Sequence, residues 1–129
     1  MQYLLLIYQA EGNAPSAADD EAMAPELADY GAFTAETRER KQFIAGEALE
    51  PTSTATSVRI RDGQTYVTDG PFAETKEALG GFYLLECKDL DEAIEMAAKI
   101  PAVKRGTIEV RPIWTLPEGY SMTPGGGAS

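Results

Sequence analysis

The chain has 129 residues, which suits one domain built around a single core. Its 21 acidic and 11 basic side chains leave a net charge of −10, and this balance weighs against nucleic acid or an anionic membrane as a partner. There is no histidine, so imidazole catalysis and zinc sites ligated by histidine are excluded.

Cys87 is the only cysteine, so no disulfide can form within the chain. We expect its side chain to pack in the core, with a reactive thiol as the alternative. No apolar run approaches the roughly 20 residues that span a bilayer, and the first residues lack the pattern of a secretory signal. The sequence predicts a cytoplasmic protein that needs no cofactor and has no metal site.

The first half of the chain alternates between strand and helix patterns. Residues 2–8 form an apolar run without alternation, which is typical of a strand covered on both faces. Ser16 is a candidate helix cap, Pro25 is expected to interrupt or restart that helix, and the main helix is predicted over residues 26–42. Its apolar stripe is weak, which predicts cover for only one side of a sheet. A short strand over residues 43–49 follows.

A hairpin is predicted next. Val58 and Ile60 alternate with two arginines, and residues 65–68 form the returning strand. The pair Asp62 and Gly63 lies between these alternating segments, and Asp-Gly in this position is a strong signal for a tight hairpin turn.

Residues 69–72, with the sequence Asp-Gly-Pro-Phe, predict a sharp turn. Pro71 is expected to start a short helical piece that ends at Gly80. Residues 81–87 then form a second strand that is apolar on both faces.

The last elements are a helix and a strand. Asp89 is a suitable cap for a helix over residues 90–99. Residues 107–116 predict the final strand, and Pro112 places it at a sheet edge because proline cannot donate to a ladder. Trp114 is expected to pack near the end of this strand.

Without the hairpin, the order of elements is the βαββαβ order of a ferredoxin-like fold. We therefore predict an α+β domain over residues 1–116 with an inserted β-hairpin, followed by a flexible C-terminal tail over residues 117–129. Helices cover only one face of such a sheet, yet both central strands are apolar on both faces. A second copy would cover the other face, so we expect a homodimer with a dimeric α/β barrel. The alternative is cover by the hairpin and the tail.

The run from Thr68 to Glu77, TDGPFAETKE, and the following LGGF resemble the DGPF-domain branch of the YCII-related family. This resemblance covers nearly all of residues 1–116 and implies a dimeric barrel of ferredoxin-like protomers. Relatives lie near genes for alternative sigma factors, which implies a sigma-factor-type protein as a candidate partner. Other YCII-related proteins carry a proposed catalytic His–Asp pair. Here Asp29 or Tyr30 falls where that histidine would be, so the pair cannot be carried over.

Asp69 is the candidate catalytic residue, as an acid, a base or a polar anchor, and the alternative is a carboxylate that caps its own turn. A small-molecule pocket is expected to use Asp69 and further residues with aromatic, cationic or turn-forming character: Tyr8, Tyr30, Arg59, Gly70, Pro71, Phe72, Lys76 and Arg111. For the aromatic and charged members the alternatives are core packing, a solvated face or internal ion pairs.

Two hypotheses on function follow. The first is a dimer that binds a small molecule in a cleft beside the sheet, with or without a histidine-independent enzymatic activity. The second is a non-catalytic module that recognises a protein such as a transcription factor. A pocket of a few hundred cubic ångströms would favour the first, and an exposed apolar patch outside the dimer contact would favour the second.

Overall fold

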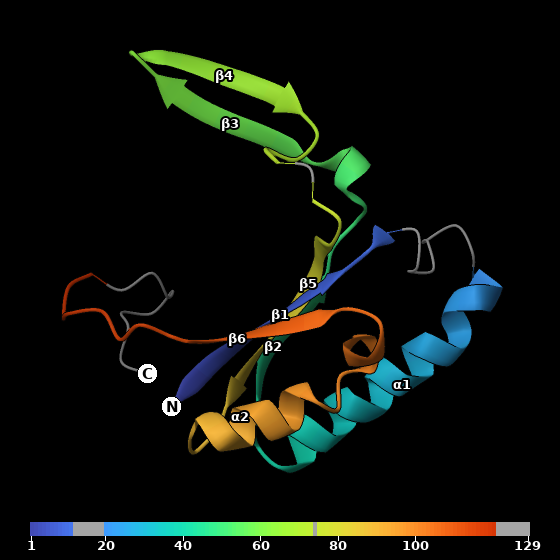
Figure 1. Cartoon of the computed structure of the whole chain (residues 1–129). Coiled ribbons are helices and arrows are strands. Elements are labelled where there is room, and N and C mark those ends of the chain that lie inside the picture. Colours follow the sequence, from blue (N-terminus) through green and yellow to red (C-terminus); the bar gives the residue numbers. More distant parts are fainter. Residues whose placement is uncertain (12–19, 74, 121–129) are drawn as a thin grey trace.

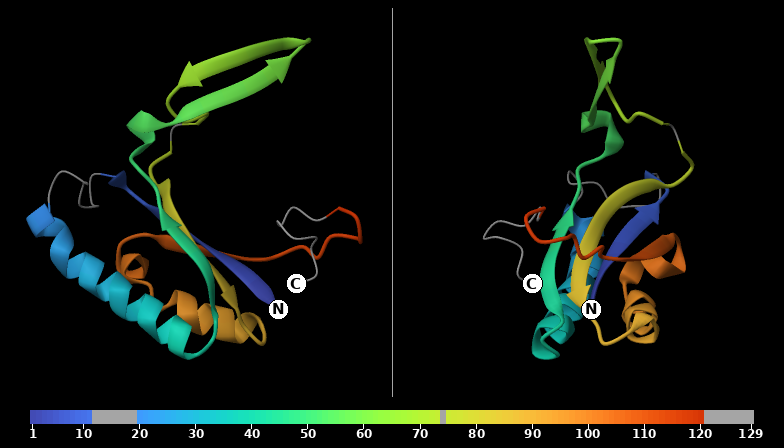
Figure 2. Two further views of the ribbon diagram at one scale, coloured as in Figure 1. Left: turned by 180° about the vertical axis from the view of Figure 1, so that it is seen from behind. Right: turned by 90° about the vertical axis from the view of Figure 1, so that its left-hand side faces the viewer.

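The computed structural model describes residues 1–11, 20–73 and 75–120, and its main layer is an antiparallel sheet with the strand order β2-β5-β1-β6 (Figure 1). The four strands are β1 (Gln2–Gln9), β2 (Phe43–Ala48), β5 (Ala78–Glu86) and β6 (Thr107–Pro112). Two helices, α1 (Asp20–Glu39) and α2 (Leu90–Ala97), lie on one face of this sheet (Figures 1 and 2). This α+β arrangement is compatible with a ferredoxin-like fold. The two strands predicted to be central and the edge position of Pro112 are confirmed.

Helix α1 differs from its prediction at both ends. It is continuous from Asp20 through Pro25, so the proline does not restart it, and the candidate cap Ser16 lies outside the described residues. The helix ends at Glu39, three residues early, because Lys41 adopts a positive φ of 60°. The backbone N–H of Gln42 then donates to the carbonyl of Thr37 at 2.8 Å, which is the bond that closes a Schellman motif.

Helix α2 begins as predicted. Asp89 caps it, and its Oδ1 accepts the backbone N–H of Glu92 at 2.9 Å. The Glu92 side chain in turn accepts the N–H of Lys88 at 3.1 Å, so two otherwise unpaired donors are satisfied at this helix end. Short 3-10 helices, η2 (Thr52–Thr54) and η3 (Pro101–Lys104), follow β2 and α2.

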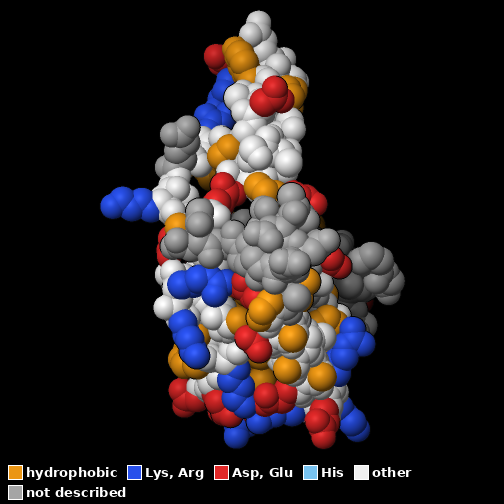
Figure 3. Space-filling view, turned by 90° about the vertical axis from the view of Figure 1, so that its right-hand side faces the viewer, with side chains coloured by type: hydrophobic (Ala, Val, Ile, Leu, Met, Phe, Trp, Pro, Cys, Tyr) orange, Lys and Arg blue, Asp and Glu red, His pale blue; other side chains and the backbone are white. Residues whose placement is uncertain are grey.

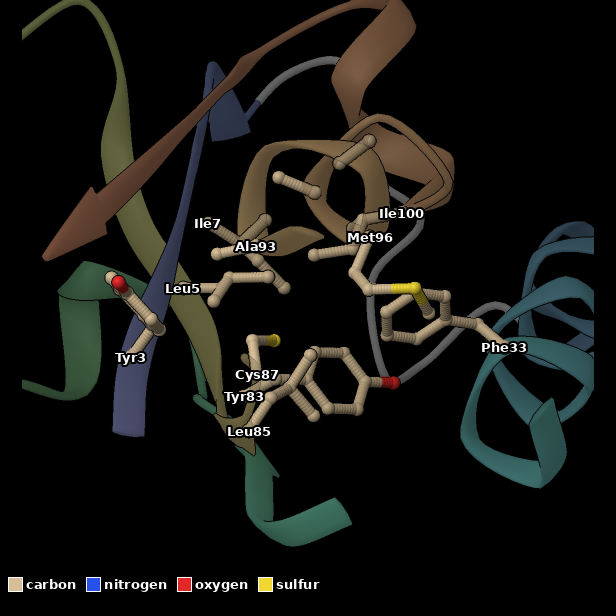
Figure 4. Close-up of a cluster of buried hydrophobic side chains, with 12 residues drawn as sticks. Tyr3, Leu5, Ile7, Phe33, Tyr83, Leu85, Cys87, Ala93, Met96 and Ile100 are labelled. Atoms are coloured by element: carbon tan, nitrogen blue, oxygen red, sulfur yellow. The ribbon is translucent and has the colours of Figure 1, made fainter. Parts of the chain in front are cut away.

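The core lies between the helices and the sheet (Figure 4). Leu5 and Leu85 point from the central strands toward Met96 and Ile100, and all four side chains are fully buried. Cys87 is also buried, as predicted for a packing residue. Burial on this scale is the main source of free energy that stabilises the domain.

The opposite face of the sheet has no layer over it among the described residues. We call it the open face, and its apolar members are Leu4, Leu6, Phe82 and Leu84. These side chains alternate with buried ones along β1 and β5 and are half-buried only by their neighbours in the sheet. The chain by itself forms an open sheet, so the two-chain barrel stays a prediction.

The inserted hairpin consists of β3 (Thr56–Arg61) and β4 (Gln64–Asp69), and we call it the arm. Asp62 and Gly63 both have positive φ, 53° and 75°, as the predicted tight turn requires. The arm forms a separate two-stranded sheet that projects from the domain (Figure 1). It therefore does not cover the open face of its own chain.

Two further expectations were wrong. No helical piece starts at Pro71 within the described residues, and β5 already begins at Ala78 because that residue pairs with Gln9 of β1. Trp114 does not pack near β6, since that strand ends at Pro112 and the indole is 78% exposed.

Candidate functional site

A groove of about 600 Å³ lies between α1 and the β2–β5 side of the sheet. We call it the helix-side groove. Its α1 wall includes four side chains spaced four residues apart along the helix, Glu26, Tyr30, Thr34 and Arg38, together with Leu27. Its floor comes from β2 and β5, and most of its surface is apolar.

Tyr83 of β5 organises the aromatic part of this groove. Its ring stacks on Tyr30 with centroids 6.5 Å apart, and it meets Phe33 edge-on at 4.9 Å. A third ring, Phe43, lies edge-on at 6.4 Å. The Tyr83 hydroxyl shares a 3.1 Å hydrogen bond with Oγ1 of Thr34. These contacts fix the rings, so the wall is pre-formed rather than adaptable.

Glycines let the floor come close to this aromatic wall. A Cβ atom at Gly46 would lie 2.9 Å from the Tyr83 ring, closer than real Cβ contacts allow. A Cβ at Gly81 would lie 2.8 Å from the carbonyl oxygen of Glu47. Glycine is therefore required at both positions, because any side chain would collide with the neighbouring ring or backbone.

Charged side chains also line the groove: Glu11, Glu26, Arg38, Glu47 and Glu50. The Arg38 guanidinium lies over the Phe43 ring, 4.6 Å from the centroid, which is a cation–π contact. Glu26 pairs with Arg105, and Arg105 Nε also donates to the Gln9 side chain at 3.1 Å. The groove therefore combines a mostly apolar surface with a few hydroxyl groups and these charged side chains.

Burial raises the pKa of Tyr30, and the neighbouring Tyr83 raises it further. A hydrogen bond with the backbone of Ala102 acts in the opposite direction, and the phenol of Tyr30 is protonated at neutral pH. For the same reason it is a poor general base there. Among the described residues no three Asp, Glu or Cys side chains converge on one point, so the groove offers no ligand set for a metal ion.

A second, shallow hollow of about 500 Å³ lies on the open-face side and is lined by Tyr8, Thr75, Lys76, Glu77, Thr107 and Glu109. Oγ1 of Thr107 donates to the Glu77 carboxylate at 2.9 Å, and Nε of Arg111 donates to Glu109 at 2.6 Å. Each of its lining residues carries a polar or charged group, but most of the surface of the hollow is apolar, and it is open to solvent.

The structure distributes the predicted site residues over three places. Tyr30 lines the helix-side groove. Tyr8 and Lys76 line the shallow hollow, and Arg111 adjoins it through its bond to Glu109. The remaining residues, Arg59, Asp69, Gly70, Pro71 and Phe72, lie along the arm and at its base.

The base of the arm is closed mainly by backbone contacts. The N–H of Gly70 donates to the carbonyl of Ala55 at 2.6 Å, and the Ser57 hydroxyl donates to the carbonyl of Gly70 at 2.8 Å. Arg59 reaches the carbonyl of Phe72 at 3.4 Å. Asp69 is exposed, and its carboxylate has no hydrogen-bond donor within the part of the chain that the structure describes.

Several groove residues were not anticipated: Thr34 as a lining residue, Arg38, Phe43 and Tyr83. The four-residue spacing from Glu26 to Arg38 was a usable signal for the α1 wall. Tyr83 carried no such signal, because a buried tyrosine in an apolar strand reads as core until the helix above it is placed.

Residues 1–117 match the YCII-related domain, and the chain therefore belongs to the YCII-related family. It is similar to the "Uncharacterized protein R00369" of Rhizobium meliloti (strain 1021). The two are 38% identical over 122 residues, which cover 88% of this chain and 92% of that protein. In the described residues no helix is long and apolar enough to cross a membrane.

Proposed function

We propose that this protein, as a member of the DGPF branch of its family, binds a small molecule in the helix-side groove and acts as a homodimer. The observation that carries the proposal is the groove itself. Its volume of about 600 Å³ suits a small ligand, and its walls are mostly apolar with a few fixed hydroxyl groups. We also propose a cytoplasmic location, because a chain with a single cysteine lacks the internal disulfides that are typical of secreted proteins.

The ligand we expect is largely apolar and carries a hydrogen-bond acceptor for the Tyr30 hydroxyl. The stacked pair of Tyr30 and Tyr83 favours a flat or aromatic portion of the ligand. We favour binding without turnover, because the protonated phenol of Tyr30 is a poor base and two carboxylates of the groove, Glu11 and Glu26, are already bound by Thr52 and Arg105.

The open face supports the dimer. Leu4 and Leu6 of β1 lie beside Leu84 and Phe82 of β5, so they form one continuous apolar surface. Large exposed apolar surfaces on a soluble chain are typical of interaction sites. Packing two such faces around a two-fold axis would complete the proposed barrel.

The test of the groove is a thermal-shift screen with a metabolite library. We expect at least one largely apolar compound to raise the melting temperature of the wild type, and Thr34→Trp to abolish that shift by filling the groove. The matched control is Ala35→Trp, which adds the same ring at an exposed neighbouring position of α1. No shift in the wild type, or an equal shift in Thr34→Trp, would overturn the proposal.

A second candidate function is a protein-interaction module, with a sigma-factor-type protein as its partner. The observation that favours it is the arm, whose apolar side chains are exposed. The two functions therefore differ in which molecule packs on the exposed apolar side chains of the arm.

A further inference from the structure

The arm is amphipathic across its two faces. Val58 lies directly opposite Val67, and Ile60 opposite Thr65, so their side chains share one face. Arg59 lies opposite Tyr66 on the other face. The side chains of Val58, Ile60 and Val67 are each more than 60% exposed, so the apolar face has no cover within the described chain.

A two-stranded ribbon of this kind needs a further layer packed on its apolar face. A two-stranded hairpin is marginally stable in water by itself, and it becomes stable when another layer packs on its apolar face. The strands of the arm pair with each other and with no strand of the main sheet. In the space-filling view the arm stands clear of the domain and carries hydrophobic side chains on its surface (Figure 3). A face of this kind is also an aggregation hazard unless it is covered.

The direction of the arm identifies where its partner lies. The arm and the segment after β6 both extend away from α1 and α2, on the side of the open face (Figures 1 and 2). That segment carries the exposed side chain of Trp114. Apolar groups from three parts of the chain therefore border one region, which is the region that a second copy occupies if the open faces pack together.

Charge favours a second copy as well. Arg59 and Arg61 balance Asp62 and Asp69, so the arm is neutral and the net charge of −10 belongs to the rest of the chain. Two acidic domains repel each other, whereas a neutral arm with two arginines can approach an acidic domain without that penalty.

We propose that the arm is a dimer clasp: in each copy the face formed by Val58, Ile60 and Val67 packs on the other copy and extends the contact between the open faces. This inference rests on the homodimer in the proposed function. It goes beyond it because it makes the arm, and with it the Asp-Gly-Pro-Phe turn at its base, part of the dimer contact.

The test compares two adjacent substitutions on opposite faces of the arm. Val67→Glu places a carboxylate on the apolar face, and Thr68→Glu places the same charge on the polar face. Analytical ultracentrifugation over a range of protein concentrations gives the dimer dissociation constant. We expect Val67→Glu to weaken the dimer by about 100-fold, since each of the two arms loses a buried valine contact. Thr68→Glu should leave the constant within about threefold of the wild type, because exposed charges contribute little.

A second variant, Val67→Thr, keeps a β-branched side chain and tests whether the arm has merely unfolded. We expect it to weaken the dimer by about tenfold while hydrogen exchange at the arm amides of the dimer remains slow. An unchanged dimer in both Val67 variants overturns the clasp and leaves the open-face dimer intact. Equal weakening by Val67→Glu and Thr68→Glu also overturns it.

A wild type that stays monomeric overturns both the clasp and the dimer, and it favours another protein as the occupant of the arm. The thermal-shift screen tests ligand binding in the helix-side groove independently of this result. A ligand-induced thermal shift that depends on Thr34 remains valid whatever the oligomeric state.

Discussion

Leu6→Glu provides the sharpest test of the open face as a dimer contact. Leu6 lies on the central strand β1, opposite Phe82, and is partly exposed in the single chain. Full burial of a leucine contributes about 1.5–3 kcal/mol, and at most about a third of Leu6 is still exposed, so its burial on association contributes about 0.5 kcal/mol. A glutamate in its place adds a desolvation cost of about 2 kcal/mol.

The two-fold symmetry doubles this effect. About 2.5 kcal/mol per copy becomes about 5 kcal/mol per dimer, and since 1.4 kcal/mol is a factor of ten, the dissociation constant should rise by roughly three to four orders of magnitude. Sedimentation equilibrium from nanomolar to high micromolar protein measures this change. Circular dichroism of the variant checks that the monomer is folded.

Ile94→Glu is the matched control. Ile94 is an exposed apolar residue on α2, on the helix side of the sheet, so its replacement should leave the dissociation constant unchanged. The reasoning would be refuted by a Leu6→Glu protein that dimerises as tightly as Ile94→Glu, because the open face would then lie outside the contact.

Four further predictions concern single positions. Gly106→Ala should lower the free energy of unfolding by about 3 kcal/mol, because its Cβ would lie 2.2 Å from the Tyr8 carbonyl. Gly31→Ala, with nothing within 4 Å, should raise it by about 0.5–1 kcal/mol, and equal urea midpoints would contradict this. Burial raises the pKa of Cys87 to about 11, so the folded thiol should resist iodoacetamide at pH 8 while the urea-unfolded thiol reacts. The neutral thiol favours the folded state, so this stabilisation is complete below the unfolded pKa of about 8.5 and is lost as pH rises toward 11. Asp69→Asn should change stability by less than about 0.5 kcal/mol, and a larger loss would show that the carboxylate holds its turn.

The sequence alone determined the sheet and its order. Two strands apolar on both faces predicted the centre, and Pro112 predicted an edge, because backbone pairing and burial leave local signatures. Asp62 and Gly63 predicted the hairpin turn for a similar local reason, since few residue types tolerate positive φ in succession. The ends of the elements were less predictable. Helix α1 ends where Lys41 adopts a positive φ, and no sequence pattern predicts that conformation for a lysine.

The site depended on the tertiary structure. Residues proposed together from the sequence, such as Tyr8, Tyr30 and Asp69, lie on three different parts of the molecule. The helix-side groove exists because α1 stands off from β2 and β5 around Tyr83, and the distance between a helix and a sheet is set by packing among residues remote in sequence. The projection of the arm is likewise a tertiary property. Its alternating pattern specified a hairpin with one apolar face, but only the fold showed that the chain leaves that face uncovered.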